Sequence, residues 1–253
     1  MLSAADTAYA IATIRALEAE LPADSRLFED PYAAVFAEAG AHAAEGTQRF
    51  LALPNFRDAV RLRVRGIDDI VRDSIATGVR QLVLMGAGFD SRSLRLPEVE
   101  AHDVRVFEVD GAGLLERKRA LLRAAGHRIP ARIAHLPCDF TTDFESALSA
   151  SLSEAGFRGH DDVLFVWEGV IPYIGVTAAA RTLRFMRQLG EAGVRVVFDI
   201  NDALLDPSTP EQFAKDAGFS GLSAVRFDDL WRRYLPGDPH PNSAVVSLAT
   251  AFT

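Results

Sequence analysis

The segment QLVLMGAGFDSRSLRL, residues 81–96, decides how the rest of the sequence is interpreted. Its first five residues form a short apolar run that is typical of a buried strand. Glycines at 86 and 88 follow directly, and glycine allows the backbone to turn sharply and a ligand to approach the main chain. A glycine pair placed directly after a strand is stronger evidence for a ligand-binding loop than an isolated G-x-G. The third glycine of the dinucleotide motif is replaced by Ser91, which argues against a pyrophosphate ligand.

Downstream of this segment, short apolar runs alternate with helical stretches, such as those at 114–125 and 177–189. We expect strands at 81–85, 105–109, 132–136, 163–166, 194–198, 222–226 and 244–251. Apolar strands separated by helices are typical of a parallel sheet that is covered on both faces. The last two runs flank the segment LPGDPHPN and predict an antiparallel pair at the sheet edge. The sequence therefore predicts an α/β fold, a doubly wound, mostly parallel, seven-stranded Rossmann-like sheet with its ligand at the carboxyl ends of the strands.

The first 78 residues are predicted to be helical. A first helix is expected behind a cap at Asp6 or Thr7, with apolar residues at 11, 14, 17 and 21. A second, short helix is expected to begin at Asp30-Pro31. A third, over residues 55–77, has an apolar stripe at 60, 64, 67 and 71. We expect a single domain, 1–253, in which 1–78 form a helical cap with lead-in helices and 79–253 form the α/β core.

The composition excludes several classes of protein. The net charge of −8 argues against a nucleic-acid coat or a basic membrane anchor, so neither partner is expected. Cys138 is the only cysteine, which excludes an intrachain disulfide and favours the cytoplasm. No apolar run is long enough for a membrane span, and the N-terminus lacks the pattern of a signal peptide. The histidines, at 42, 102, 127, 135, 160 and 240, have no metal-ligand spacing, so no metal is expected.

Acidic residues follow successive strands. Asp110 ends the second strand, 24 positions after Gly86, where a carboxylate can accept hydrogen bonds from both hydroxyls of a ribose. Alternatively, it caps the helix that begins near Gly111. In PCDF, after the third strand, Asp139 could meet an adenine amino group and Phe140 could pack on the ring. A simple turn aspartate explains Asp139 equally well.

Glu168, in WEG after the fourth strand, is either a helix cap or a residue that faces the cleft. Three acids at successive strand ends favour a shared site. Such a rim suits a ligand that carries hydroxyls, amines and positive charge, and it repels a polyphosphate.

One arginine is separated from the other 24 by its position on the third helix. Arg61, Arg65 and Arg72 are expected on a solvated face, whereas Arg63 falls at the border of the apolar stripe. A partly buried arginine needs an anionic partner, which is either the carboxylate of a ligand or a structural salt bridge.

Six segments together resemble the bacterial branch of the leucine carboxyl methyltransferase-like family of S-adenosylmethionine-dependent O-methyltransferases, which includes polyketide O-methyltransferases. They are LFEDPYA (27–33), LRVRGIDDIV (62–71), QLVLMGAGFDSRSLRL (81–96), FEVD (107–110), PCDF (137–140) and WEGVIPYI (167–174). The resemblance implies S-adenosyl-L-methionine as cofactor and S-adenosyl-L-homocysteine as product. It implies that the methionine part of the cofactor meets Arg63 and the loop of Gly86, Ala87 and Gly88. It also implies that Glu168 faces either the methionyl amine of the cofactor or the cleft.

The resemblance further implies that the ribose meets Asp110 and the adenine meets Asp139 and Phe140. Tyr173 takes the position of an aromatic residue near the methyl acceptor. The segment WEGVIPYI and the short helical cap depart from the family pattern, and both departures concern the acceptor.

A small-molecule carboxylate is the favoured acceptor. A carboxylate is ionised at pH 7 and needs no general base, whereas a phenol would be helped by one. No histidine falls in a matched motif, and no catalytic residue is identified. Arg15 or Arg26 could orient a carboxylate acceptor.

Two other functional classes of protein are alternatives. A nicotinamide-dependent oxidoreductase would carry a third glycine and a Tyr-x-x-x-Lys pair, yet neither Lys118 nor Lys215 has a tyrosine four residues earlier. A non-catalytic binding module would not need the intact set of Arg63, Gly86, Asp110 and Glu168. The acceptor and the oligomeric state stay open at this point.

Overall fold

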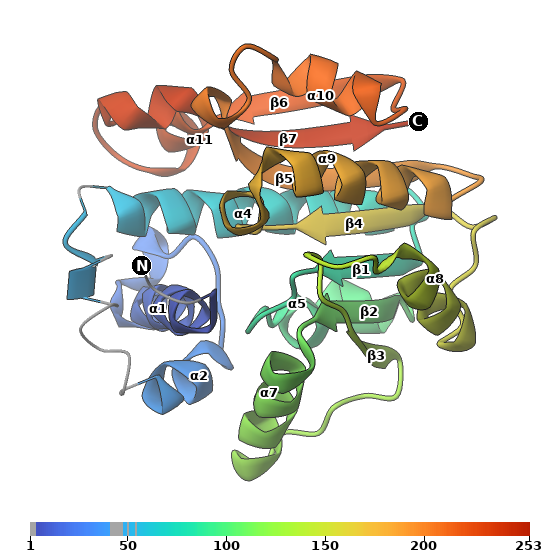
Figure 1. Ribbon diagram of the computed structural model, residues 1–253. Helices are drawn as coiled ribbons and strands as arrows, with labels where there is room; N and C mark the ends of the chain where they lie inside the picture. The colour runs from blue at the N-terminus through green and yellow to red at the C-terminus, as the bar shows by residue number, and fades with distance from the viewer. Residues whose placement is uncertain (1–3, 41–47, 50, 54) are drawn as a thin grey trace.

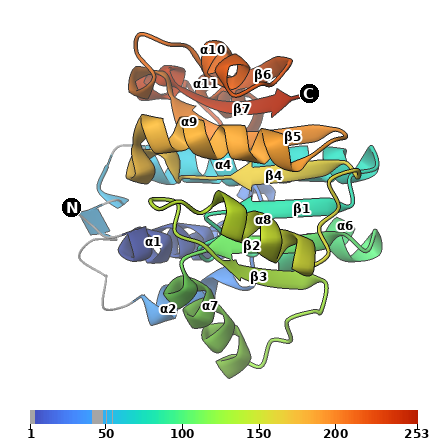
Figure 2. The same ribbon diagram turned by 45° about the vertical axis from the view of Figure 1, so that its right-hand side comes forward.

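A seven-stranded sheet forms the centre of the molecule (Figure 1). The computed structural model describes residues 4–40, 48, 49, 51–53 and 55–253. The strands are β1 (Gln81–Met85), β2 (Arg105–Asp110), β3 (Ile133–Pro137), β4 (Val163–Trp167), β5 (Val194–Asn201), β6 (Gly221–Arg226) and β7 (Val246–Phe252). Their order is β3-β2-β1-β4-β5-β7-β6, and Figure 2 shows this succession from β7 to β3. All seven predicted strands are present within three residues at each end, so the predicted fold class is confirmed.

Strand direction follows the prediction as well. The strands β1 to β5 pair in parallel, and β7 pairs antiparallel with both β5 and β6. The late strands therefore form the antiparallel pair expected at the sheet edge, with β7 as the inner strand.

Ten α-helices are described around the sheet. They are α1 (Ala4–Leu17), α2 (Ala33–Ala39), α4 (Phe56–Ala76), α5 (Arg92–Arg95), α6 (Pro97–Ala101), α7 (Ala112–Ala124), α8 (Glu145–Glu154), α9 (Ile171–Leu189), α10 (Pro210–Asp216) and α11 (Phe227–Tyr234). Short 3-10 turns lie at Glu18–Glu20, Ala23–Ser25, Asp202–Leu204 and Pro241–Val245. No described helix combines the length and the apolar character that crossing a membrane requires.

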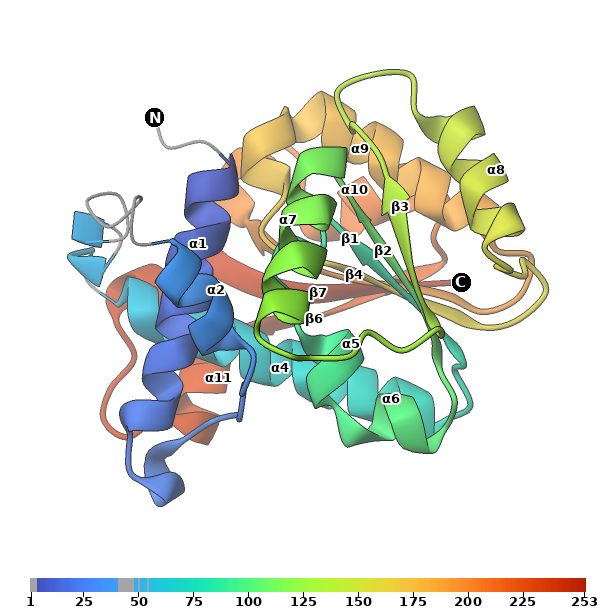
Figure 3. The same ribbon diagram turned by 90° about the horizontal axis from the view of Figure 1, so that it is seen from below.

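Both faces of the sheet are covered by helices (Figure 3). Val83 and Met85 of β1 belong to an apolar cluster with residues of α8, α9 and α10. Leu82 and Leu84 point to the opposite face and pack with residues of α4, α6 and α11. Because both faces are buried, these strands are apolar throughout instead of alternating, which is the signal that the sequence carried.

The helix α4 buries its apolar stripe as predicted, but the expected solvated face is wrong for one residue. Val60, Val64, Ile67 and Val71 are all buried. Arg61 is buried too, and its guanidinium bonds Glu18 at 2.7 Å and Asp58 at 3.0 Å. The 3-10 turn Glu18–Glu20 packs against this side of α4, and the helical period of α4 alone does not reveal that contact. Arg65 and Arg72 are half-buried and ion-pair with Asp69.

The start of the chain differs from the prediction in three details. Helix α1 begins at Ala4, so Asp6 lies in its first turn instead of capping it, and Leu21 lies beyond its end. Pro31 lies in a turn, and α2 begins at Ala33. The carboxylate of Asp30 accepts hydrogen bonds from the main-chain N–H groups of residues 32 and 33, at 3.1 Å each, and this local turn delays the helix.

Candidate active site

The predicted site residues line one cavity of about 880 Å³. It lies where the carboxyl ends of the parallel strands meet α1, α4 and the first turn of α9. All nine predicted residues line it: Arg63, Gly86, Ala87, Gly88, Asp110, Asp139, Phe140, Glu168 and Tyr173. The parallel topology brings residues more than 100 positions apart in sequence to one edge of the sheet.

The loop after β1 requires glycine at two positions. Gly86 has φ +74°, and a Cβ there would lie 2.3 Å from Val170 Cγ2. Gly88 has φ +47°, and its N–H donates to Asp110 Oδ2 at 2.7 Å. Ala87 between them is buried. The positive φ values of Gly86 and Gly88, and the contact of Gly86 with Val170, explain why the chain can turn sharply directly after β1.

Asp110 lines the cavity, and its carboxylate accepts hydrogen bonds from two main-chain N–H groups. Its Oδ1 accepts a hydrogen bond from Gly111 N at 2.6 Å, next to the start of α7, and its Oδ2 accepts the bond from Gly88. Burial of this carboxyl raises its pKa, and the two N–H bonds only partly oppose that effect. The side chain therefore links two elements and also lines the cavity.

Asp139 has the geometry of a turn aspartate. Its Oδ1 accepts from Thr141 N at 2.9 Å and from Thr141 Oγ1 at 2.6 Å, and these bonds lower its pKa. It still lines the cavity beside Cys138. Phe140 is buried and packs edge to face on Phe144, with 5.6 Å between the ring centroids.

Arg63 is held by two carboxylates. Its Nε donates to Glu168 Oε1 at 2.8 Å and its Nη1 donates to Asp199 Oδ2 at 3.0 Å. Asp199 Oδ1 also accepts from Gly169 N at 2.6 Å. The structural salt bridge that the sequence analysis considered is therefore present. The side chain lines the cavity as well, so the salt bridge and a ligand contact are compatible.

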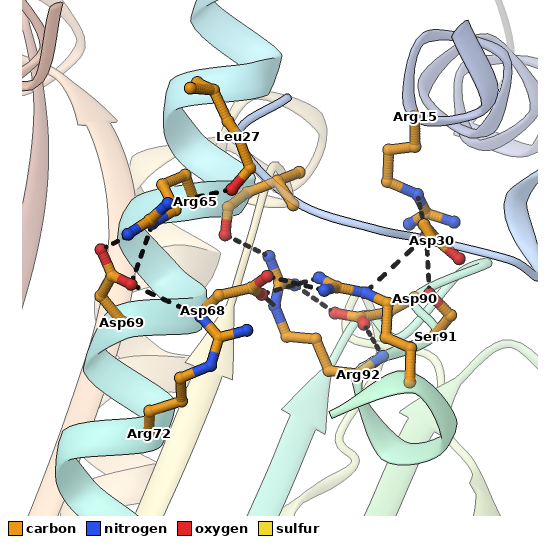
Figure 4. A network of polar contacts seen from close by, with 12 residues as sticks. Arg15, Leu27, Asp30, Arg65, Asp68, Asp69, Arg72, Asp90, Ser91 and Arg92 are labelled. Carbon is orange, nitrogen blue, oxygen red and sulfur yellow. Dashed lines mark hydrogen bonds and ion pairs between the residues drawn. The ribbon is translucent and has the colours of Figure 1, made fainter. Parts of the chain in front are cut away.

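Glu168 also belongs to a buried network of charged side chains around Arg92, part of which Figure 4 shows. Arg92, with 1% of its side chain exposed, contacts Asp68 at 2.8 Å, Asp90 at 2.5 Å and Glu168 at 2.7 Å. Asp68 is shared with Arg95 at 2.6 Å. Burial disfavours ionisation of Glu168, but the charges of Arg92 and then Arg63 outweigh it and lower the pKa of this carboxyl.

Burial and neighbouring positive charges also have opposite effects on the pKa of Asp90, which lines the cavity. Burial opposes its ionisation, yet the charges of Arg92, Arg15 and Lys118 lower its pKa to about 2. The carboxylate is therefore charged at any physiological pH.

Three residues of the site, Asp199, Asp90 and Arg92, were not predicted from the sequence. Asp199 lies in VRVVFDIN, near the end of a predicted strand, so the signal that identified the other acids was available for it. Asp90 and Arg92 lie inside the segment GAGFDSR. No periodic pattern shows that an arginine in such a short segment will be buried.

The cavity is acidic. Five carboxylates line it, those of Asp90, Asp110, Asp139, Glu168 and Asp199, against the guanidinium groups of Arg15 and Arg63. This balance suits a cationic ligand. Tyr173, 47% exposed, stands at the first turn of α9, which Gly175 (φ 76°, ψ 164°) separates from the main helix.

Histidine is absent from the described lining of the cavity, and His42 lies outside the described residues. In the part of the chain that the structure describes, no group of three or more His, Cys, Asp or Glu side chains could hold a metal ion.

The sequence is similar to a methyltransferase family model and to named methyltransferases. The sequence model of the family described as leucine carboxyl methyltransferase matches residues 8–187. A protein of Parafrankia sp. (strain EAN1pec), named as an S-adenosyl-L-methionine-dependent methyltransferase, is 34% identical over 91% of this chain and 72% of its own. A protein of Streptomyces avermitilis with the same kind of name is 31% identical over 92% of this chain and 78% of its own.

Solved structures show the same fold. A structure from Thermobifida fusca YX, named as a methyltransferase, superposes with a TM-score of 0.61 at 18% identity, covering 85% of this chain and 88% of its own. A DUF574 family protein from Streptomyces avermitilis gives a TM-score of 0.61 at 15% identity, covering 97% and 96%.

Proposed function

The chain belongs to the leucine carboxyl methyltransferase family and is an S-adenosylmethionine-dependent methyltransferase, and we propose that its acceptor is the carboxylate oxygen of a small molecule such as a polyketide acid. Membership of this family sets aside the nicotinamide-dependent oxidoreductase and the non-catalytic module. The cytoplasm is the proposed location, because Cys138 is the only cysteine.

The cavity residues fit the cofactor. Gly86 and Gly88 hold the loop after β1 at positive φ, and the main chain of this loop lines the cavity, where a ligand can meet it. The excess of carboxylates complements the ammonium and sulfonium charges of S-adenosyl-L-methionine. In this proposal, Arg63 faces the methionine carboxylate and Asp110 faces the ribose hydroxyls.

The remaining cofactor contacts follow the same order along the sheet edge. Asp139 and Phe140 face the adenine, Gly86, Ala87 and Gly88 lie under the methionine, and Glu168 faces the ammonium group. When bound, the cofactor supplies a methyl group that its positively charged sulfur already activates for transfer. The tasks left to the protein are alignment of the acceptor and exclusion of water.

The observation that carries the carboxylate proposal is the state of the cavity acids. Each of the five already accepts a hydrogen bond from the protein: Asp90 from Arg92, Asp110 from Gly88 and Gly111, Asp139 from Thr141, Glu168 from Arg63 and Arg92, and Asp199 from Arg63 and Gly169. A carboxylate binds a proton too weakly to be an efficient base for a phenol, and the described lining contains no histidine. A phenol, with a pKa near 10, would need a base, whereas a carboxylate arrives ionised.

Product chemistry tests this proposal. The protein is incubated with S-adenosyl-L-methionine labelled in its methyl group and with matched pairs of carboxylic acids and phenols. We expect methyl esters, which mild alkali hydrolyses, and a rate that changes little between about pH 6 and pH 8, because the acceptor stays ionised throughout. Alkali-stable methyl ethers as the main product would contradict the proposal.

A further inference from the structure

One face of α1 lines the cavity and carries a single charged group. The lining residues of this helix are Thr7, Ala8, Ile11 and Arg15. Positions 7, 11 and 15 recur every four residues and therefore share a face. In Figure 4, Arg15 extends from its helix toward Asp30, close to Asp90 and Ser91.

The guanidinium of Arg15 is only partly used by the protein. Its Nη2 donates to Phe89 O at 2.5 Å, and its Nε lies 3.0 Å from Asp30 Oδ2. Nη1 makes no hydrogen bond with any described residue, and unlike Nε it is not among the buried unpaired atoms. The side chain is 7% exposed and lines the cavity, so its fixed end offers a free donor to a ligand.

The other cation of the described lining, Arg63, is the one proposed to meet the cofactor. Arg63 pairs with Glu168 and Asp199, and its proposed ligand is the carboxylate of the cofactor. An anionic acceptor that enters a cavity lined by five carboxylates needs a cation of its own. The negative charge of Asp90, which also faces Arg15, is balanced by Arg92 at 2.5 Å.

We propose that Arg15 is the acceptor-specificity residue and that its free Nη1 donates a hydrogen bond to the carboxylate of the acceptor. This inference rests on the proposed function and extends it by naming the group that selects the acceptor. The apolar part of the acceptor would then lie along Ala8 and Ile11. A charge-assisted bond from a fixed guanidinium favours a carboxylate over its neutral ester, which is the product of the reaction.

Arg26 provides the matched control. Like Arg15, it was a predicted candidate for orienting the acceptor. Its guanidinium donates to Leu21 O and Ala19 O, and it is not among the residues that line the cavity. Removal of its charge should leave acceptor binding unchanged. Removal of the charge at Arg15 should also leave a folded protein, because Asp30 still accepts hydrogen bonds from Ser91 and from two main-chain N–H groups.

The experiment measures binding, so it does not depend on turnover. A series of carboxylates, from short fatty acids to octanoate and benzoate, is titrated calorimetrically into protein saturated with sinefungin, a cationic analogue of the cofactor. The corresponding methyl esters serve as neutral probes. We expect wild type and Arg26→Met to bind the best carboxylate about tenfold or more tighter than its ester, and Arg15→Met to lose that preference.

Two results would overturn the proposal. One is a wild-type protein that binds no carboxylate more tightly than its ester. The other is an Arg15→Met protein that still binds sinefungin and keeps the full preference. Arg15→Lys tests the charge separately, because a lysine should recover part of the preference. If Arg15 determines carboxylate binding but methyl esters never form, this inference stands and the proposed function fails.

Discussion

At the scale of the residue, Arg63 combines a structural contact with a proposed ligand contact. Its partners Glu168 and Asp199 lie at the ends of neighbouring strands, so the arginine bridges β4 and β5 from α4. A ligand that meets this side chain meets a group that is already oriented from two sides. The two roles can be separated by comparing ligands that share an adenosine.

Arg63→Met should weaken S-adenosyl-L-homocysteine but leave adenosine binding almost unchanged, because only the full ligand carries a carboxylate. Asp110→Ala should weaken both ligands by about 1.5–3 kcal/mol, since both contain the ribose. Titration calorimetry with the two ligands checks these expectations. Equal losses for both ligands in Arg63→Met would assign the arginine to the fold alone. Unchanged affinity in Asp110→Ala would limit Asp110 to its bonds with the N–H groups of Gly88 and Gly111.

Asp90 predicts a dependence of stability on pH. Its pKa is lowered to about 2 in the folded protein, so its contribution to stability is complete above about pH 4 and is lost as the pH falls toward 2. We expect Asp90→Asn to reduce the free energy of unfolding by about 2 kcal/mol at pH 6, with a smaller difference at pH 3. Urea denaturation of both proteins at several pH values measures this, and a difference that is independent of pH would contradict the assignment.

At the scale of the element, the loop after β1 is fixed by its contact with the residue that precedes α9. Gly86→Ala would place a Cβ 2.3 Å from Val170 Cγ2 in a backbone with φ +74°, which should cost about 1–3 kcal/mol of stability and weaken cofactor binding. Gly113→Ala, in α7, meets no atom within 4 Å and should change stability by less than about 1 kcal/mol. Thermal denaturation and titration with S-adenosyl-L-homocysteine test both variants.

A second substitution separates the clash with Val170 from the strain of the positive φ in Gly86→Ala. Adding Val170→Ala removes the contact but leaves the positive φ, so the double variant should recover part of the lost stability. No recovery would show that Val170 does not limit the loop.

Some elements were predictable and others were not, for physical reasons. Strands such as β1 and β4 are buried on both faces, and their apolar runs stand out in the sequence. The acids at strand ends were predictable because parallel strands share one functional edge. Helices α5, α6, α8, α10 and α11 were missed because they have only 4 to 10 residues, too few to establish a helical period.

Buried arginines were the least predictable part of the site. Arg61 and Arg92 are buried by segments far from them in sequence, namely the turn at Glu18–Glu20 and the helix α4. The burial of a charge depends on a partner that another element brings, and a local pattern contains no information about that partner. Arg63 was identified because it lies at the border of an apolar stripe on its own helix.

At the scale of the whole molecule, we propose that the cap and the core form one domain. Ile14 of α1 and Leu27 share an apolar cluster with Leu82 and Val166 of the sheet. Unfolding in urea should therefore give the same midpoint by far-ultraviolet circular dichroism and by the fluorescence of Trp167 and Trp231, and S-adenosyl-L-homocysteine should shift both midpoints together. Two separate transitions would contradict a single domain.

The acidity of the cavity predicts an order of binding. An anionic acceptor is repelled by the five lining carboxylates until a cationic ligand fills the cofactor site. A carboxylate probe should therefore bind at least about threefold tighter to the complex with sinefungin than to the complex with neutral S-adenosyl-L-homocysteine, and added salt should reduce the ratio. Titration of the probe into each complex measures it, and equal affinities would remove charge as the cause of the order.

The position of β7 in the sheet affects how the chain folds while it is being synthesised. β7 is inserted between β5 and β6, although β6 precedes it in the chain. A ribosome makes the chain from its N-terminus, so β6 emerges before the only described strand with which it pairs. Until β7 has been made, β5 presents an open edge to the cell, and an open edge can pair with another chain. We therefore expect chains that end before residue 246 to aggregate more readily than the full chain.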